Sequence, residues 1–461
     1  METVKLKSPV DGSVYAERPV ASEQQINAAV ERARAAQLDW AQTPLGERGK
    51  YLLGFLDALL AKNDEIVPEL AWQMGRPVRF GGEKGGVEER TRYMVDLAES
   101  ALRPFVPPDE KPGFRRYLKR EPLGVVFTIA PWNYPYLTAV NSIVPALMAG
   151  NAVLLKHAAQ TLLVGERFQA AFDKAGLPKG LFQNLVMSHG QTEKLLGSGK
   201  VDHCNFTGSV GGGRAIEKAA AGTFTTLGLE LGGKDPAYVL PDVKLDHAVA
   251  NLVDGAFYNT GQCCCGIERV YVHEDVYDDF VEGFVAETKN YVVGSPLDEA
   301  TTMGPMAQPR FADFVREQRA EALRKGATAH IGMKVDRDLE GSPYLAPEVL
   351  TNVDHQMSVM REESFGPIVG IMKVRNDEEA IALMNDSPYG LTASIWTADA
   401  DHAAAIGDRV ETGTVFMNRC DYVDPGLVWT GVKDTGKGGA MSVVGYENLT
   451  RPKSYHLRQA V

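Results

Sequence analysis

The hydrophobic pattern near the N-terminus predicts a layer of helices. Ser22-Glu23-Gln24-Gln25 has the form of a capping box, and apolar side chains then recur at helical spacing, at Ile26, Ala29, Val30 and Ala33. We therefore expect the chain to open with an amphipathic helix. Helical patterns continue over about 45–75 and 84–102, with Gly75 as a stop signal between them.

Two polar segments have an extended pattern. After the prolines between Pro104 and Pro112, the basic run Arg115–Arg120 fits either a solvated linker or an edge strand that pairs with another element. The segment Ser454–Arg458 fits either a tail or a strand lent to another subunit. The pattern alone leaves both alternatives open.

From Gly124 onward, short β-rich apolar runs alternate with helical ones. Such alternation is typical of a parallel sheet with crossover helices. A second alternating region begins near Val270–Val272 and continues to about Asn418, so we predict an α/β fold with two doubly wound domains. The strand candidates before that region are Val125–Ala130, Ala152–Leu155, Asn184–Val186, Cys204–Phe206 and Ala237–Leu240.

Composition narrows the class of protein. A chain of 461 residues is long for one core, and its 44% hydrophobic and 23% charged residues are globular averages. The 60 acidic residues exceed the 48 basic ones, giving a net charge of −12, which argues against a nucleic-acid partner. The first residues lack the apolar centre of a signal peptide, and no stretch of eighteen apolar residues occurs. We expect a cytoplasmic protein with no membrane partner.

The cysteines point to a reduced thiol. They are five in number, with three consecutive at Cys263, Cys264 and Cys265, and they form neither a disulfide framework nor a zinc pattern. We therefore expect no metal site. A cysteine is more often a small buried hydrophobe than a nucleophile, so the triplet needs support from the rest of the chain.

A glycine-rich turn follows the strand predicted over Cys204–Phe206. Thr207-Gly208-Ser209-Val210-Gly211-Gly212-Gly213 leads into a helix that we expect to begin near Arg214. Glycines at such a junction let the backbone approach a phosphate, although many such turns are only turns and the spacing is not G-x-G-x-x-G. Lys156 ends a neighbouring strand, where ligands bind in such sheets, so the two features together favour a nucleotide site.

Four motifs occur in order along the chain. They are Pro131-Trp132-Asn133-Tyr134-Pro135, Glu230-Leu231-Gly232-Gly233-Lys234, Gly261-Gln262-Cys263-Cys264 and Glu362-Glu363-Ser364-Phe365-Gly366-Pro367. In this order they resemble the aldehyde dehydrogenase superfamily, whose members oxidise aldehydes to acids with NAD or NADP. The match covers essentially the whole chain. Lys156-His157-Ala158-Ala159 is similar to a bacterial subgroup often labelled succinate-semialdehyde dehydrogenase.

The resemblance implies three catalytic residues. Cys264 matches the nucleophile, whose tetrahedral adduct must form before hydride can leave the aldehyde carbon. Asn133 matches the amide that donates to the oxyanion, a contact whose loss typically costs about 10²–10³ in rate. Glu230 matches the general base that hydrolyses the thioester, and relatives that transfer the acyl group to coenzyme A generally lack it. Cys263 and Cys265 are expected to pack beside Cys264, with which either thiol can form a reversible disulfide on oxidation.

The resemblance also implies the residues that hold the cofactor. Glu363 and Phe365 match residues at the nicotinamide ribose and ring, and the remaining matches are Lys156, Ser209, Gly208, Gly213 and Trp132. Ala159 stands where many NAD-preferring relatives carry a Glu that would repel a 2′-phosphate. We therefore predict that NADP is accepted as well as NAD.

The substrate positions by the same resemblance are Tyr134, Thr138, Asn141, Tyr258, Asp421, Val423 and Trp429. Relatives that bind succinic semialdehyde have Arg at the positions of Asn141 and Tyr258, and neither residue can pair with an anion as Arg does. We therefore expect a neutral aliphatic or aromatic aldehyde. A semialdehyde stays as the alternative, with Arg419 as the one nearby cation.

The predicted organisation has three parts. Residues 1–103 and 123–232 form a cofactor-binding domain, residues 233–434 a catalytic domain, and residues 104–122 and 435–461 an oligomerisation element and C-terminal tail. We expect a homodimer or homotetramer. The alternatives are an acyl-transferring or esterase-like enzyme, a catalytically silent scaffold, and a papain-like hydrolase, for which no His stands in a recognisable partner motif.

Overall fold

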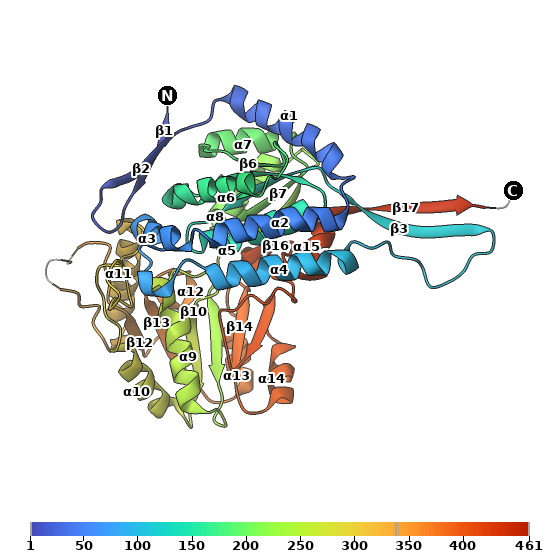
Figure 1. The fold of residues 1–461 in the computed structure, drawn as a ribbon. Helices are drawn as coiled ribbons and strands as arrows, with labels where there is room; N and C mark the ends of the chain where they lie inside the picture. Colours follow the sequence, from blue (N-terminus) through green and yellow to red (C-terminus); the bar gives the residue numbers. More distant parts are fainter. Residues whose placement is uncertain (1, 337–338, 340, 460–461) are drawn as a thin grey trace.

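Two large β-sheets flanked by helices form the body of the protein (Figure 1). The computed structural model describes residues 2–336, 339 and 341–459. The first sheet has the strand order β16-β8-β7-β4-β5-β6 and the second β11-β12-β13-β10-β9-β14-β15. Neighbouring strands are parallel except in the pairs β16–β8 and β11–β12. The predicted α/β fold with parallel sheets is confirmed.

The strands are short, and five of them, β4 and β5 in the first sheet and β9, β12 and β14 in the second, are buried along their whole length. The first sheet contains β4 (Val125–Ala130), β5 (Ala152–His157), β6 (Phe182–Asn184), β7 (His203–Thr207), β8 (Thr226–Glu230) and β16 (Gly436–Lys437). The second contains β9 (Asp235–Val239), β10 (Ile267–His273), β11 (Thr328–Ala329), β12 (Glu348–Thr351), β13 (Ile368–Val374), β14 (Thr392–Trp396) and β15 (Thr414–Met417).

Two strand predictions need correction. The strand predicted over Asn184–Val186 shares only Asn184 with β6. The one predicted over Ala237–Leu240 forms β9, which lies inside the second sheet instead of extending the first alternating region. A buried strand of a parallel sheet reads as a plain apolar run, so its pattern does not reveal which sheet it joins.

The helices cover the sheets, and α5 packs directly against β4 and β5. The helices before β9 are α1 (Glu23–Trp40), α2 (Leu45–Leu60), α3 (Asn63–Met74), α4 (Lys84–Ala101), α5 (Pro135–Met148), α6 (Leu162–Lys174), α7 (His189–Gly197) and α8 (Val210–Ala220). Those after it are α9 (Leu245–Phe257), α10 (Tyr277–Thr288), α11 (Pro309–Arg324), α12 (Ser358–Arg361), α13 (Asp377–Asn385), α14 (Ala400–Gly407) and α15 (Ser442–Asn448). None of the helices in the described ranges has the length and apolar character needed to cross a membrane.

The ends of the N-terminal helices follow the sequence signals. Ser22 and Gln25 form both hydrogen bonds of the predicted capping box, and Gly75 ends α3 with φ = 86°. A Cβ at Gly75 would lie 2.5 Å from the carbonyl oxygen of Pro305, so only glycine fits. The expectation that the chain opens with a helix is wrong, because the hairpin of β1 (Thr3–Lys7) and β2 (Val14–Pro19) precedes α1. Each of these strands buries a single residue, which leaves almost no hydrophobic pattern.

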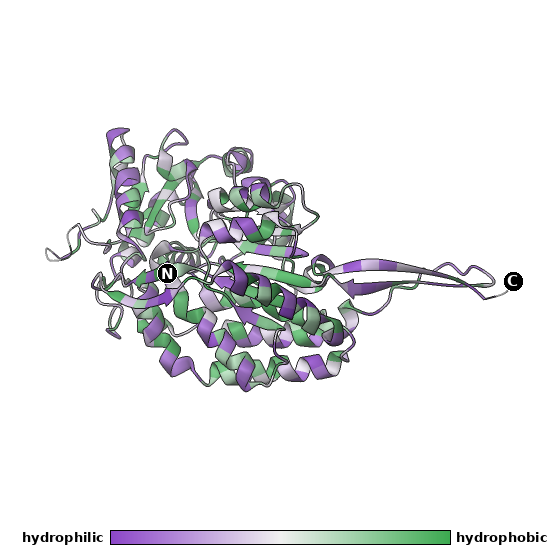
Figure 2. Cartoon of the chain, turned by 90° about the horizontal axis from the view of Figure 1, so that it is seen from above, coloured by the Kyte–Doolittle hydropathy of each residue, from purple (hydrophilic) through white to green (hydrophobic). Residues whose placement is uncertain are grey.

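A two-stranded arm extends from the body (Figures 1 and 2). β3 (Phe114–Pro122) pairs antiparallel with β17 (Thr450–Arg458) along its whole length. The basic run is therefore a strand and not a linker. The last residues of the predicted tail, 460–461, lie outside the described residues.

The segment before β17 belongs to the body. β16 pairs with β8 of the first sheet, and α15 packs against α4 and α5. Part of the region that we grouped with the C-terminal tail thus completes the first sheet. The chain passes from the first sheet to the second between β8 and β9. The domain boundaries themselves stay a prediction.

Candidate active site

A cavity of about 740 Å³ lies at the carboxyl ends of the strands of the first sheet. This is where open α/β sheets bind ligands, and the volume suits a dinucleotide and a small substrate. Residues from all four motifs reach it. The predicted site residues that line it are Trp132, Asn133, Lys156, Ala159, Gly208, Ser209, Glu230, Cys264, Glu363 and Phe365.

The three consecutive cysteines differ in their access to this cavity. Cys264 is half-buried and lines it, whereas Cys263 and Cys265 are only 7% and 4% exposed and pack with Leu391 and Trp429. The Sγ atoms of Cys263 and Cys265 lie 3.5 Å apart. A nucleophile must reach its substrate, so exposure singles out Cys264.

Ease of ionisation does not follow access to the cavity among these thiols. A hydrogen bond with Cys263, together with burial, raises the pKa of Cys264, while hydrogen bonds from the other two thiols lower the pKa of Cys263. Ionisation alone would therefore favour Cys263. Cys263 does not border the cavity, however, so its thiolate could not reach a substrate there. We therefore infer that Cys264 is the nucleophile and needs a base to remove its proton.

The backbone before Cys264 is held in a strained turn. In the 3-10 turn η3 (Tyr258–Gly261), Asn259 and Thr260 have φ values of 54° and 60°. A Cβ at Gly261 would lie 2.3 Å from the carbonyl oxygen of Gly366, so the glycine of the motif allows this close approach. Gln262 closes the turn, since its side chain donates to the Asn259 carbonyl oxygen and accepts from the Ala307 N–H.

Asn133 lies between β4 and α5, 4% exposed, with its side chain beside the cysteine turn. Its Nδ2 donates to the carbonyl oxygen of Gln262 at 3.3 Å, and its own carbonyl oxygen accepts from Asn259 Nδ2 at 3.2 Å. One N–H of the amide stays available for an oxyanion, and these contacts restrict its direction.

A buried ion pair that we did not predict supports Asn133. Arg76 and Glu83 form a 2.5 Å contact with side chains only 2% and 3% exposed, and Arg76 Nη2 donates to the Asn133 carbonyl oxygen. Glu83 Oε2 accepts from the N–H groups of Tyr136 and Leu137, and so caps α5, whose N-cap residue has no side-chain hydrogen bond. No local signal marks this pair, because its partners meet only in the tertiary structure.

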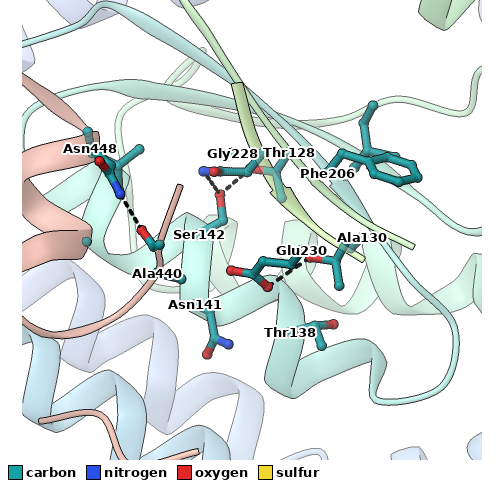
Figure 3. A pocket seen from close by; sticks show the side chains of 16 residues that line it. Thr128, Ala130, Thr138, Asn141, Ser142, Phe206, Gly228, Glu230, Ala440 and Asn448 are labelled. Carbon is teal, nitrogen blue, oxygen red and sulfur yellow. Dashed lines mark hydrogen bonds between the residues drawn. The ribbon is translucent and has the colours of Figure 1, made fainter. Parts of the chain in front are cut away.

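Glu230, the last residue of β8, has the properties of a base that works near neutral pH. Burial raises its pKa to about 7, against a 3.2 Å hydrogen bond from Thr207 and the charge of Arg90. Glu230 lines the large cavity and also a second cavity of about 20 Å³ (Figure 3). The second cavity is lined by polar groups, among them Ser142 and Asn205, and has room for about one water molecule.

The other predicted cofactor residues surround the large cavity, with one exception. Gly213 does not line it, because a Cβ there would lie 2.6 Å from the side chain of Leu231; this glycine allows close packing, and Gly212 borders the cavity instead. The helix expected to begin near Arg214 already begins at Val210, and the Ser209 side chain caps it by accepting from the Gly212 N–H.

Two ionisable groups face the cavity. Lys156 is 8% exposed, burial lowers its pKa, and it forms no hydrogen bond or ion pair within the described ranges. Burial raises the pKa of Glu363 to about 8, and its Oε1 accepts from the Gly233 N–H. Phe365 meets Trp132 edge to face at 5.6 Å between ring centroids. An ammonium group and a carboxyl without a full set of partners fit the ribose hydroxyls and phosphates of a nicotinamide dinucleotide.

The predicted substrate residues divide into two groups. Tyr134 and Val423 pack with Cys264 against the cluster that contains Trp429, and Tyr258 packs against Phe80 at 4.8 Å between ring centroids. Thr138 and Asn141 line the small cavity beside Glu230, as Figure 3 shows.

The expectation that Arg419 is the one nearby cation is wrong. Arg419 is exposed and stacks on the ring of Tyr422 at 3.9 Å. Two buried guanidinium groups also contact predicted substrate residues: Arg90 Nη1 donates to Asn141 Oδ1, and Arg76 stands 4.8 Å over the ring of Tyr134. Both come from segments far from the motifs in the sequence.

Comparisons with known proteins agree with the motifs. The model of the aldehyde dehydrogenase family matches residues 1–455. The chain is 36% identical over 430 residues to an aldehyde dehydrogenase of Paenarthrobacter nicotinovorans, covering 92% of this chain and 93% of that protein. It is 32% identical over 450 residues to succinate-semialdehyde dehydrogenase [NADP(+)] 1 of Mycobacterium tuberculosis, covering 97% and 98%.

Solved structures share the whole fold. The crystal structure of succinate-semialdehyde dehydrogenase from Burkholderia pseudomallei has a TM-score of 0.95 at 28% identity, covering 99% of this chain and 95% of that chain. The predicted resemblance is thus confirmed. The chain belongs to the aldehyde dehydrogenase family, and it is an NAD(P)-dependent aldehyde dehydrogenase.

Proposed function

We propose that the protein oxidises an aldehyde to the free acid through a thioester on Cys264, which Glu230 helps to hydrolyse. The observation that carries this proposal is that Cys264 alone of the three thiols lines the cavity that Asn133, Glu230 and Glu363 also line. The same observation counts against a catalytically silent scaffold, because all the reacting groups are present and share one space.

The chemistry follows from the properties of these groups. Glu230 takes the proton of Cys264 Sγ, which then attacks the aldehyde carbon to form a thiohemiacetal. Asn133 Nδ2 and the Cys264 N–H donate to the oxyanion. A bound nicotinamide supplies the acceptor for the hydride that leaves this carbon. Glu230 releases the first proton to solvent and then takes one from water, the resulting hydroxide adds to the thioester, and the thiolate leaves.

The residues in the cavity suit a dinucleotide. Lys156 offers an ammonium group that has no partner among the residues that the structure describes, and Glu363 offers a carboxyl beside Gly233. Gly208 permits close approach of the backbone, since a Cβ there would lie 2.7 Å from the ring of Phe206. We propose that Lys156 and Glu363 hold the ribose groups and that the turn at Gly208 and Ser209 faces the phosphates.

The first test is the product of the reaction. With an aldehyde and NADP, we expect one free acid for each NADPH formed, with or without coenzyme A, because Glu230 activates water. Formation of an acyl-coenzyme A would support the acyl-transferring alternative. Ester hydrolysis without NADPH formation would support the esterase-like one. If no aldehyde gave NADPH or NADH, the catalytically silent scaffold would be the alternative that remains.

Cofactor choice is tested at Ala159, which lines the cavity in the turn that follows β5. Replacing Ala159 by Glu places a carboxylate where the 2′-phosphate of NADP is expected, and repulsion should raise KM for NADP by about tenfold or more while KM for NAD changes little. Steady-state kinetics with both cofactors measures this, with Ala159→Gln as the uncharged control. A strong preference of the wild type for NAD that Ala159→Glu leaves unchanged would refute the prediction.

We also propose that the arm of β3 and β17 pairs with another subunit in a homodimer or homotetramer. The outer edges of its two strands carry backbone N–H and C=O groups, which pairing with a strand of another subunit would cover. Cytoplasmic localisation stays our expectation, based on composition and reduced cysteines.

A further inference from the structure

Lys234 and Glu268 form an ion pair that is almost completely buried. Their side chains are 0% and 5% exposed, and the Nζ and Oε2 atoms lie 2.5 Å apart. Lys234 ends the motif that begins at Glu230, and Glu268 lies in β10, four residues after Cys264. Neither member of the pair lines the large cavity. Burying two charges costs free energy that their attraction only partly recovers, so stability alone does not explain the pair.

The pair contacts the loop of residues 363–365, which carries two of the proposed cofactor residues. Glu268 Oε2 accepts from the Ser364 N–H at 2.7 Å, and Glu268 Oε1 accepts from the Phe365 N–H at 2.9 Å. Lys234 Nζ donates to Ser364 Oγ at 2.9 Å as well as to Glu268. Three hydrogen bonds from one buried ion pair therefore fix the backbone and a side chain of this loop.

The backbone conformation of the 363–365 loop requires such support. Phe365 has φ = 48°, a left-handed conformation that residues other than glycine rarely adopt and that persists only where the surrounding structure imposes it. With the loop in this conformation, Glu363 and Phe365 both line the large cavity, and Phe365 meets the ring of Trp132. Without the hydrogen bonds to Glu268, the loop could relax and carry both side chains away from these positions.

A second carboxylate of the same sheet has the same arrangement away from the cavity. Glu348 is 0% exposed, accepts at 2.9 Å from the N–H groups of Ile331 and Gly332, and pairs with Arg319 at 2.7 Å. None of these four residues lines the large cavity. A buried carboxylate that accepts from two consecutive N–H groups can therefore serve the fold alone. What distinguishes Glu268 is that its loop lines the cavity.

We propose that Lys234 and Glu268 are a positioning pair for the nicotinamide half of the cofactor, which they orient through Glu363 and Phe365 without touching it. This inference rests on the proposed function, in which Glu363 holds a ribose of the cofactor. The buried cation keeps the Glu268 carboxyl ionised, so both of its oxygens remain free to accept from adjacent N–H groups. Because NAD and NADP share the nicotinamide half, the pair should affect both cofactors alike.

The test replaces Glu268 by Gln and measures the Kd of NADPH by its fluorescence and the KM of NADP and NAD by steady-state kinetics. Gln has one acceptor oxygen and one NH2 donor, so the loop loses one of its two backbone hydrogen bonds. We expect the Kd of NADPH and both KM values to rise by about tenfold, and KM for the aldehyde to change by less than about twofold. Lys234→Met should act in the same direction. The double variant should lose about as much as the larger single loss, because the two residues act as one unit.

Glu348→Gln is the matched control, because it makes the same change at a loop that does not line the cavity. It should lower the thermal stability and leave the Kd of NADPH unchanged. Alkylation of Cys264 by iodoacetamide in the free enzyme is the second control, and its rate should stay within about twofold of the wild type in Glu268→Gln. An unchanged Kd in Glu268→Gln, or an equal rise in Glu348→Gln, would overturn the proposal. A changed alkylation rate with an unchanged Kd would mean that Glu268 acts on the cysteine turn instead.

Cofactor binding and turnover separate the two levels of inference. A wild type that binds NADPH but oxidises no aldehyde would refute the proposed function and leave the role of the pair to be decided by the Kd values. If Glu268→Gln does not fold, amide hydrogen exchange of the wild type gives the answer. Without cofactor, the N–H groups of Ser364 and Phe365 should exchange as slowly as those of β13. Fast exchange that only NADPH suppresses would mean that the cofactor fixes the loop, and would overturn the proposal.

Discussion

Replacing Cys264 by Ala is expected to abolish aldehyde oxidation, with kcat/KM falling by about 10⁴-fold or more. The reason is that no hydride leaves the aldehyde carbon until a nucleophile has added to it, and Cys264 is the only one of the three thiols that lines the cavity. The measurement is NADPH formation in steady state, together with thermal unfolding to show that the variant is folded.

Cys263→Ala and Cys265→Ala are the matched controls. Both thiols are buried against Leu391 and Trp429, so these changes should cost packing and keep activity within about tenfold of the wild type. They also test whether access to the cavity or ease of ionisation identifies the nucleophile, because the neighbouring thiols lower the pKa of Cys263. Equal losses at all three positions, or a total loss only in Cys263→Ala, would contradict the choice of Cys264.

Replacing Glu230 by Gln is expected to trap the acyl enzyme. Gln keeps the size and the hydrogen bond from Thr207 but cannot take a proton, so hydrolysis of the thioester should slow by about 10²–10⁴-fold. If Cys264 still ionises slowly, NADPH should appear as a burst of one equivalent per site and then almost stop. Mass spectrometry should find the acyl group on Cys264.

The pH dependence of the wild type tests the same residue. A base acts when it is deprotonated, and burial raises the pKa of Glu230 to about 7, so kcat should rise as the pH increases through about 7. Glu230→Gln should lose this step. Glu363 is the control, since its pKa is raised to about 8 and its proposed role is to hold the cofactor. Glu363→Gln should raise KM for the cofactor without trapping an acyl enzyme; a trapped acyl enzyme there would transfer the role of base to Glu363.

The order and spacing of motifs along the chain were enough to predict which residues at strand ends belong to the candidate site. Asn133 follows the predicted strand Val125–Ala130, and parallel strands bring their carboxyl ends to one edge of a sheet. Glu230 ends β8, a strand that the hydrophobic pattern did not predict, and only its motif pointed to it. The place of Asn133 at the large cavity therefore follows from local pattern and topology. The same holds for Gly75 and for the capping box at Ser22, where a single local signal decides the backbone.

The sequence patterns did not predict elements that bury few hydrophobic residues, or contacts whose partner is distant along the chain. The hairpin of β1 and β2 buries one residue in each strand, and Arg115–Arg120 became recognisable as a strand only through its pairing with β17. Gly213, which does not line the large cavity, shows a related limit of the sequence pattern. A glycine pattern shows that the backbone needs room, and the structure shows that Leu231 takes that room.

The sequence by itself determined the family, the α/β fold and the three residues proposed to react, because each depends on motifs whose order can be read without knowledge of contacts. Only the tertiary structure decided which charges meet. Arg76 joins Glu83 behind Asn133, and Arg90 reaches Asn141 from a helix 51 residues earlier in the chain. Electrostatic interactions between side chains depend on distance and burial, and neither can be read from positions along the chain. For this reason the proposed nucleophile could be assigned from the sequence, whereas the pairing of these buried charges could not.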